Sequence, residues 1–172
     1  NVLVANGKTL NVYGALNSSG RTITVGGEGF SGTLVLNNAA NASMTAEWVI
    51  TSGSTVRCMN NSALGSGLVT LDGGTLDFNS QTIGSTITLN MSGTGTLQNV
   101  TVDGAILSYT SSSGNDGITA SNTTWTSGKI DIGRLLQGFS AEGSNTVDLG
   151  SNLGANFTVL GLETGQYRIE GS

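Results

Sequence analysis

A short motif, Thr followed by an apolar, a variable and an apolar residue, recurs along the chain at nearly constant spacing. Between residues 33 and 99 its copies begin 22, 20 and 21 residues apart. A further copy starts 24 residues before these, and one more lies near the C-terminus. The copies occupy residues 9–12, 33–36, 55–58, 75–78, 96–99 and 146–149. Alternating apolar positions of this kind are typical of a β-strand with one buried face.

A second motif, Thr or Ser followed by an apolar residue, Thr and an apolar residue, shares the same period. It occupies residues 22–25, 43–46 and 86–89, which begin 21 and 43 residues apart. Short strands that repeat every 20 to 25 residues, separated by Gly and Asn, are typical of a β-solenoid. In that architecture stacked coils bury the apolar residues that a single coil cannot. We therefore predict a right-handed parallel β-helix with about 21 residues per coil.

Alternation along the first motif also predicts which side chains face the core, because successive residues of a strand point to opposite sides. The expected inward residues are Leu34, Leu36, Val56, Cys58, Leu76, Phe78 and Leu97. The expected outward residues are Val35, Arg57, Asp77 and Gln98, with Arg57 and Asp77 close enough on adjacent coils to pair. Asn99 falls on the inward parity. There the strand either shifts its register into Val100 or buries an Asn ladder.

The alternative architecture is an antiparallel β-sandwich. Asn6-Gly7 and Asp72-Gly73-Gly74 both resemble hairpin turns between alternating runs. The repeats are clear over residues 8–105 and irregular over 106–172, yet no Pro-rich or charged linker separates the two parts. We therefore expect residues 1–172 to form one domain.

Composition narrows the class of protein. Glycine makes up 27 of 172 residues, which excludes long helices because each interior Gly costs a helix about 1 kcal/mol. Hydrophobic residues still account for 37 %, enough for a folded core. With a net charge of −5 and only six Lys and Arg residues, the chain lacks the basic patch that binds nucleic acid. No apolar run is long enough for membrane insertion. The chain begins with Asn1 rather than Met, as expected for a processed or excised segment.

The residues that usually carry catalysis are scarce. The sequence has no His and only one Cys, so it offers no Ser–His triad, no thiolate metal cluster and no intrachain disulfide. Cys58 is expected to be a buried structural thiol. Asp72 lies in a glycine turn and Asp77 faces outward, which suits turn capping better than acid–base catalysis. We therefore predict no catalytic residue, no cofactor and no metal site, and a protein that is not an enzyme.

The second motif offers a candidate ligand face. If its copies stack, their outward hydroxyl residues form one column, which could order water against ice or contact a glycan. These residues are Thr22, Thr24, Ser43, Thr45, Thr86 and Thr88. The structural alternative is that Thr is simply a good strand residue.

Residues 63–84 carry a family resemblance. Their sequence, Ala-Leu-Gly-Ser-Gly-Leu-Val-Thr-Leu-Asp-Gly-Gly-Thr-Leu-Asp-Phe-Asn-Ser-Gln-Thr-Ile-Gly, resembles the autotransporter-associated β-strand repeat of bacterial secreted and surface proteins. The likeness is close over about residues 45–100, where Trp48-Val-Ile50 before Gly53 also fits. It implies a parallel β-helix outside the cell or on the bacterial surface, often within adhesins, with no catalytic residue to carry over. Passengers of this family are usually much longer than this chain.

The two ends of the predicted solenoid are the last feature that bears on its function. A β-solenoid has an unpaired strand edge at each end, and here no amphipathic helix, Pro or Lys cluster covers either one. The expected edge residues are Val2, Leu3, Val4, Tyr167, Arg168 and Ile169. We expect a non-enzymatic extracellular structural solenoid, either a surface adhesin passenger segment or a filament subunit that associates with itself end to end. A host surface or a glycan would be its other partner. The alternative is a binding module for ice or glycan.

Overall fold

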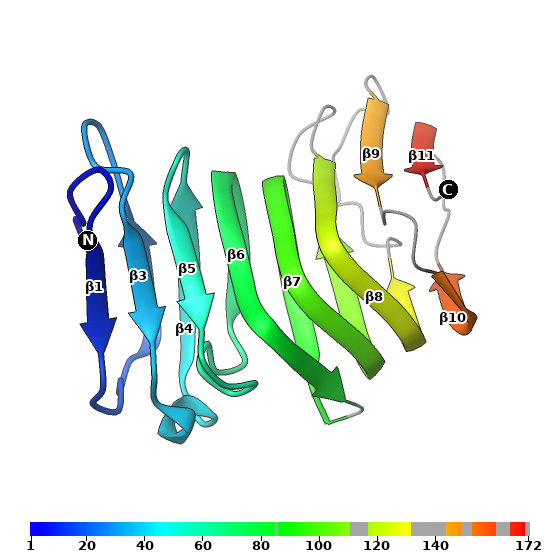
Figure 1. Cartoon of the computed structure of the whole chain (residues 1–172), viewed down its shortest axis with the longest axis horizontal. Helices are drawn as coiled ribbons and strands as arrows, with labels where there is room; N and C mark the ends of the chain where they lie inside the picture. The colour runs from blue at the N-terminus through cyan, green and yellow to red at the C-terminus, as the bar shows by residue number, and fades with distance from the viewer. Residues whose placement is uncertain (85, 111–116, 132–143, 149–152, 161–165, 171–172) are drawn as a thin grey trace.

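The computed structural model describes residues 1–84, 86–110, 117–131, 144–148, 153–160 and 166–170. These residues form strands that follow one another along the long axis of the molecule (Figure 1). The strands are β1 (Thr9–Val12), β2 (Ser19–Val25), β3 (Thr33–Leu36), β4 (Thr45–Thr51), β5 (Thr55–Cys58), β6 (Leu68–Gly84), β7 (Thr88–Thr110), β8 (Gly117–Asp131), β9 (Ser144–Asp148), β10 (Leu153–Leu160) and β11 (Gln166–Glu170). A short 3-10 helix, η1 (Ala39–Asn41), follows β3.

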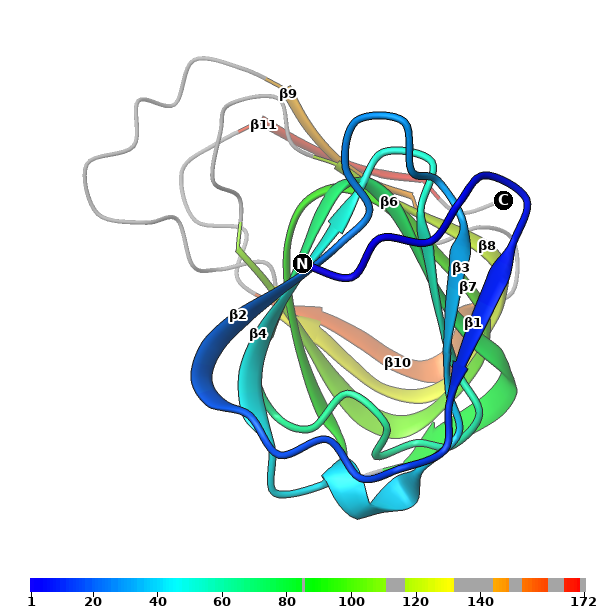
Figure 2. The same cartoon turned by 90° about the vertical axis from the view of Figure 1, so that its left-hand side faces the viewer.

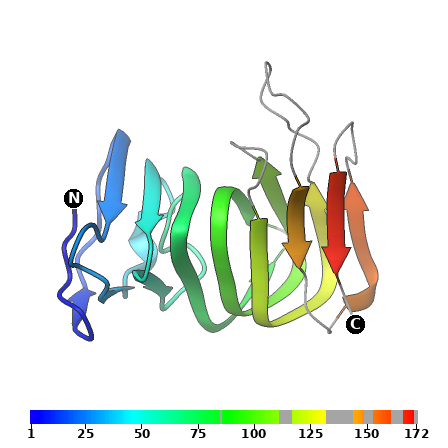
Figure 3. The ribbon, with the colours of Figure 1, turned by 90° about the horizontal axis from the view of Figure 1, so that it is seen from above.

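The fold is a parallel β-solenoid. Every pair of named strands runs parallel, with about 22 residues between bridged positions. Viewed along the rod, the coils wind around a common axis (Figure 2), and viewed from above they follow one another from the N-terminus onward (Figure 3). The sandwich alternative is therefore wrong. None of the helices in the described part of the chain is long and apolar enough to cross a membrane.

The first motif sets the register of the longest run of strands, whose order is β1-β3-β5-β6-β7-β8-β9-β11. Each threonine of this series pairs with the next, so the spacing seen in the sequence equals the number of residues in one coil. The series is Thr9, Thr33, Thr55, Thr75 and Thr96. The copy near the C-terminus does not continue this alignment, because its Thr pairs with a glycine two positions before the expected partner.

Long strands turn corners and serve several faces of the rod. Within β6, residues 69–73 pair with β4 and residues 75–77 pair with β5. Residues 68–72, 75–77 and 81–84 pair with β7. Gly73, at the first corner, has φ +76°, a conformation that only Gly adopts readily. A Cβ on Gly74 would come within 2.4 Å of the Ile50 carbonyl oxygen of the previous coil. Asp72-Gly73-Gly74 is therefore a corner within one strand, not a hairpin.

The core lies inside the coils. All seven residues expected to face inward are buried, and the alternation rule is confirmed for them. Trp48 fills the largest volume in this core, and its indole Nε1 donates a hydrogen bond to the Leu64 carbonyl at 3.0 Å. Two residues expected to be exposed are buried instead, namely Val35 and Asp77. Val35 does not belong to the apolar core cluster, and the Asp77 carboxylate bonds to Arg57 and Gln98, the outward residues of the adjacent coils.

Candidate functional site

An ion pair joins two outward positions of adjacent coils. Arg57 of β5 and Asp77 of β6 are register partners, and the Arg57 Nε donates to the Asp77 Oδ2 at 2.9 Å. The Arg57 side chain is 41 % exposed, whereas that of Asp77 is fully buried. The alternation rule therefore predicted the correct face for Asp77, which points away from the core. The expectation of an exposed carboxylate is wrong, because neighbouring coils cover it.

Three further groups hold the Asp77 carboxylate. The Asn79 amide N and the Asn99 Nδ2 donate to Oδ1 at 2.8 and 3.0 Å, and the Gln98 Nε2 donates to Oδ2 at 3.3 Å. Burial alone raises the pKa of Asp77, but these hydrogen bonds and the one from Arg57 together lower it below its ordinary value of 3.8. The carboxylate is charged, and both of its oxygens accept hydrogen bonds from neighbouring residues. This arrangement suits a structural role that links coils better than a role in proton transfer.

An Asn ladder continues this cluster along a corner of the rod. Asn79, Asn99 and Asn122 all have φ near +50°, and the Asn122 Nδ2 donates to the Asn99 Oδ1 at 2.7 Å. After Asn99 the register shifts, and Val100 becomes buried. Of the two outcomes foreseen at Asn99, the register shift occurs. The Asn ladder forms but is not buried, because Asn79 and Asn122 are exposed and Asn99 is half-buried. Asn tolerates this left-handed conformation better than most residues, a signal that could have marked the corner in the sequence.

Cys58 is a buried thiol inside the core, as expected. Burial, and secondly the negative charge of Asp77, raise the pKa of the Cys58 thiol well above its ordinary value. The thiol therefore stays protonated and inaccessible at neutral pH, which removes it as a nucleophile or metal ligand.

The first coil exposes apolar side chains that later coils bury. Leu10 stands in the same register column as Leu34, Val56, Leu76 and Leu97, which are at most 2 % exposed. Leu10 itself is 44 % exposed, because among the described residues no strand lies beyond β1. At this end, side chains on the core side of the strand are therefore exposed.

A cavity of about 310 Å³ opens at this end. Its walls are mostly apolar and reach core residues that lie two coils deep. The lining residues are Asn1, Val2, Leu10, Val12, Leu16, Thr22, Ile23, Leu34 and Trp48. Leu3 and Tyr13, which are 51 % and 74 % exposed, add apolar surface to the first coil.

The terminal residues expected at the edges are placed differently at the two ends. Val2 forms a single parallel bridge with Val25 of β2, and the N-terminal segment crosses the end of the coil (Figure 2). Val4 is buried. Val2 therefore lies at the edge beyond β2, whereas β1 is the edge strand of the series that continues with β3. A contact role of Val2, Leu3 and Val4 stays a prediction. At the other end Tyr167, Arg168 and Ile169 lie in β11, whose described partner is β9.

The threonines of the second motif do not form the expected column. Thr22 pairs with Glu47 and Thr24 with Val49, while Thr45 pairs with Ser19. The insertion of η1 between β3 and β4 lengthens this coil, so equal spacing in sequence does not become stacking in space. The prediction of one aligned Thr face is wrong.

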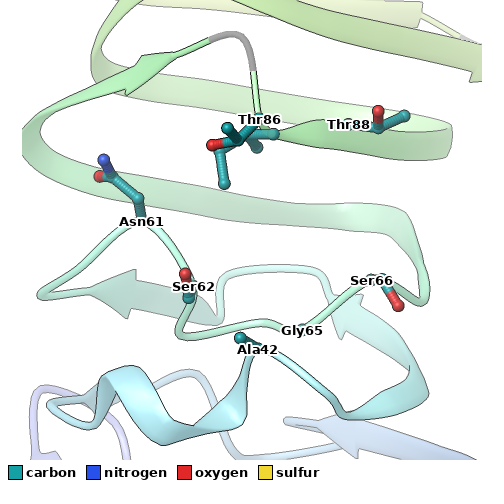
Figure 4. Close-up of a pocket in the computed structure, with 8 residues that line it drawn as sticks. Ala42, Asn61, Ser62, Gly65, Ser66, Thr86 and Thr88 are labelled. Carbon is teal, nitrogen blue, oxygen red and sulfur yellow. The ribbon is translucent and has the colours of Figure 1, made fainter.

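Thr86 and Thr88 instead line a pocket of about 440 Å³ between two coils (Figure 4). Across the pocket from them lie residues of the loop between β5 and β6, with Asn61 and Ser62 below Thr86 in the view. The full lining is Ala42, Asn61, Ser62, Gly65, Ser66, Thr86, Ile87 and Thr88. It contains hydroxyl and amide groups but no charged side chain.

A third, more open hollow carries two carboxylates. Glu28 and Asp72 line it together with Gly27, Thr51 and Ser52. Among the described residues, however, no group of three or more His, Cys, Asp or Glu side chains could hold a metal ion. Its two carboxylates therefore do not support a proposal of a cation site.

Comparison with known proteins adds no family to this picture. No family model, curated protein or solved structure matches the chain.

Proposed function

We propose that the protein is a non-enzymatic structural β-solenoid that acts outside the cell or on a bacterial surface, as a filament subunit or adhesin passenger segment. Its coils would stack end to end with those of further copies. The observation that carries this proposal is Leu10, an inward position left 44 % exposed at the open first coil. The extracellular setting is supported by the resemblance of residues 63–84 to the autotransporter-associated repeat.

Stacking would remove two unfavourable features together. The open coil leaves apolar side chains in water, and their burial is favourable at roughly 25 cal/mol per Å². It also leaves the outer backbone groups of β1 without a strand partner among the described residues, and such an edge is a template for another strand. A head-to-tail contact of this type need not close, so it yields filaments rather than dimers.

The proposal that the protein is not an enzyme is supported by the structural roles of Asp77 and Cys58. The buried carboxylate of Asp77 accepts four hydrogen bonds and has a lowered pKa. The chain has no His, and its one thiol is sealed in the core. These groups hold the coils together and leave little for acid–base or nucleophilic chemistry.

The edge of β1 allows a direct test. In a parallel ladder the N–H and C=O of one residue point to the same neighbour, and successive residues alternate. The carbonyls of Lys8 and Val12 accept from β3 and its flanking residue, so the backbone of Asn11 faces the open edge. Asn11→Pro should therefore abolish self-association and leave the fold intact, because Pro removes only an outward donor. Asn11→Ala keeps that donor and should associate normally.

The measurement is light scattering and electron microscopy at high protein concentration, with circular dichroism as the check on folding. A strictly monomeric wild type would overturn the proposal. Equal association of the Pro and Ala variants would show that the β1 edge is not the contact.

A second candidate function is the binding of a neutral glycan in the pocket of Figure 4. It is favoured by the lining of hydroxyl and amide groups without charge, beside the apolar Ile87 and Ala42. Ice binding loses its support, because the threonines do not form a flat array.

For the glycan site, the double variant Thr86→Val and Thr88→Val should lose binding on a glycan array and in NMR titrations with the best array hit. Thr22→Val, an exposed hydroxyl on another coil, is the matched control and should bind as the wild type does. Silence of the wild type across the array would exclude this function.

A further inference from the structure

The pocket of Figure 4 lies where the hydrogen-bonded ladder between coils is interrupted. On its lower side, the Ser66 amide N donates to the Met44 carbonyl of the preceding coil at 2.9 Å. On its upper side, pairing between β6 and β7 begins only beyond the pocket, at Leu68. Among the described residues, no backbone hydrogen bond joins residues 62–66 to residues 86–88. Peptide groups that would pair in a regular ladder are therefore open to a ligand.

One wall of this pocket carries an acceptor that lacks a donor. The Asn61 Nδ2 donates to the Thr82 carbonyl at 2.5 Å, which fixes the orientation of the side-chain amide. The Asn61 Oδ1 is buried and has no hydrogen-bond partner. A buried polar atom without a partner is unfavourable, so a ligand that brings a donor to this wall is stabilised. The hydroxyl groups of Ser62 and Thr86 line the pocket with Asn61 and can donate or accept (Figure 4).

The rest of the lining favours a neutral ligand with a small apolar group. Ala42 and Ile87 contribute apolar surface, one from each coil. No charged side chain lines the pocket, so neither an acidic sugar nor a free amine would find a counter-charge there. The volume of about 440 Å³ lies within the usual range of small-ligand sites.

Resting on the glycan-binding candidate described above, we infer that the pocket binds a neutral glycan that carries N-acetylhexosamine residues. The N-acetyl group is a secondary amide, so its N–H and C=O pair with peptide groups in the same way as a neighbouring strand does. Its N–H also supplies the donor that Asn61 lacks. Its methyl group packs against Ala42 and Ile87. A hexose without this group donates through its hydroxyls but leaves the apolar part of the pocket in water.

The experiment is a set of NMR and calorimetric titrations of the whole chain with soluble oligomers of chitin, cellulose and chitosan. Their sugars are N-acetylglucosamine, glucose and glucosamine. The chitin oligomer should bind about ten-fold more tightly than the other two, because one added hydrogen bond and one buried methyl group amount to about that factor.

A filled pocket provides the matched test. Ala42→Leu places a larger side chain in the apolar part of the pocket and should weaken chitin binding about ten-fold. Ala40→Leu makes the same change at an exposed position of η1 outside the pocket lining, and it should bind as the wild type does. Circular dichroism checks that both variants fold.

The outcomes separate this inference from the glycan-binding candidate. If the cellulose oligomer binds as tightly as the chitin oligomer, the N-acetyl preference is wrong and glycan binding stands. If the three oligomers and a wider glycan array are all silent, both are overturned. Chitin binding that Ala42→Leu leaves unchanged would place the site elsewhere on the molecule and overturn the inference.

Discussion

Leu76→Asp is expected to unfold the protein or drive it into aggregates. Leu76 is fully buried between Val56 and Leu97 of the adjacent coils. An unpaired carboxylate there has no donor to replace water, and its burial costs several kcal/mol. Because most domains are stable by only about 5–15 kcal/mol, a loss of this size is decisive.

Thermal unfolding followed by circular dichroism, with gel filtration of the soluble fraction, measures this effect. Leu76→Met keeps the volume and the apolar character, so it should cost less than about 1.5 kcal/mol. A melting curve of Leu76→Asp that matches the wild type would show that this position does not face the core.

Asp77→Leu should also destabilise the protein, by about 1–3 kcal/mol. The variant removes the acceptor of four donors at once, from Arg57, Asn79, Gln98 and Asn99. Parity alone predicts the opposite, because an outward residue tolerates an apolar replacement. Urea unfolding of this variant against Glu47→Leu, an exposed carboxylate that should change stability by at most about 0.5 kcal/mol, tests the difference. Equal stability of the two variants would contradict the role of Asp77.

The pH dependence of stability provides an independent check on Asp77. Its folded pKa lies below the ordinary value of 3.8, so the unfolded chain takes up the proton first as the pH falls. The stabilisation is therefore complete above that value and is lost as the pH drops through the lower folded pKa. Asp77→Asn should be less stable at neutral pH and should lose less stability on acidification. An identical acid dependence of both proteins would remove the carboxylate from this account.

Much of the fold could be predicted because its information is local. A strand alternates with a period of two, so Leu34, Val56 and Leu76 had to share a face. A coil of regular length places each motif above the previous one, which is why Thr33, Thr55 and Thr75 are true register partners.

The sequence predictions failed where the position of a residue depends on the length of its coil or on residues distant in sequence. The equal spacing of the second motif suggested a column, but η1 and the corners change the path length, so Thr22 meets Glu47. The pocket that contains Thr86 and Thr88 depends on a loop more than twenty residues away, which no local pattern reveals.

By itself the sequence determined the all-β class, the period, the parallel stacking and the inward face, because each follows from repeats and alternation. Only the tertiary structure decided which outward residues are covered. Asp77 and its exposed counterpart Glu47 have similar chemistry, yet one is sealed by Arg57, Gln98 and Asn99 from other coils. The open end at Leu10 was likewise decided in three dimensions, because exposure depends on which coil lies above a residue.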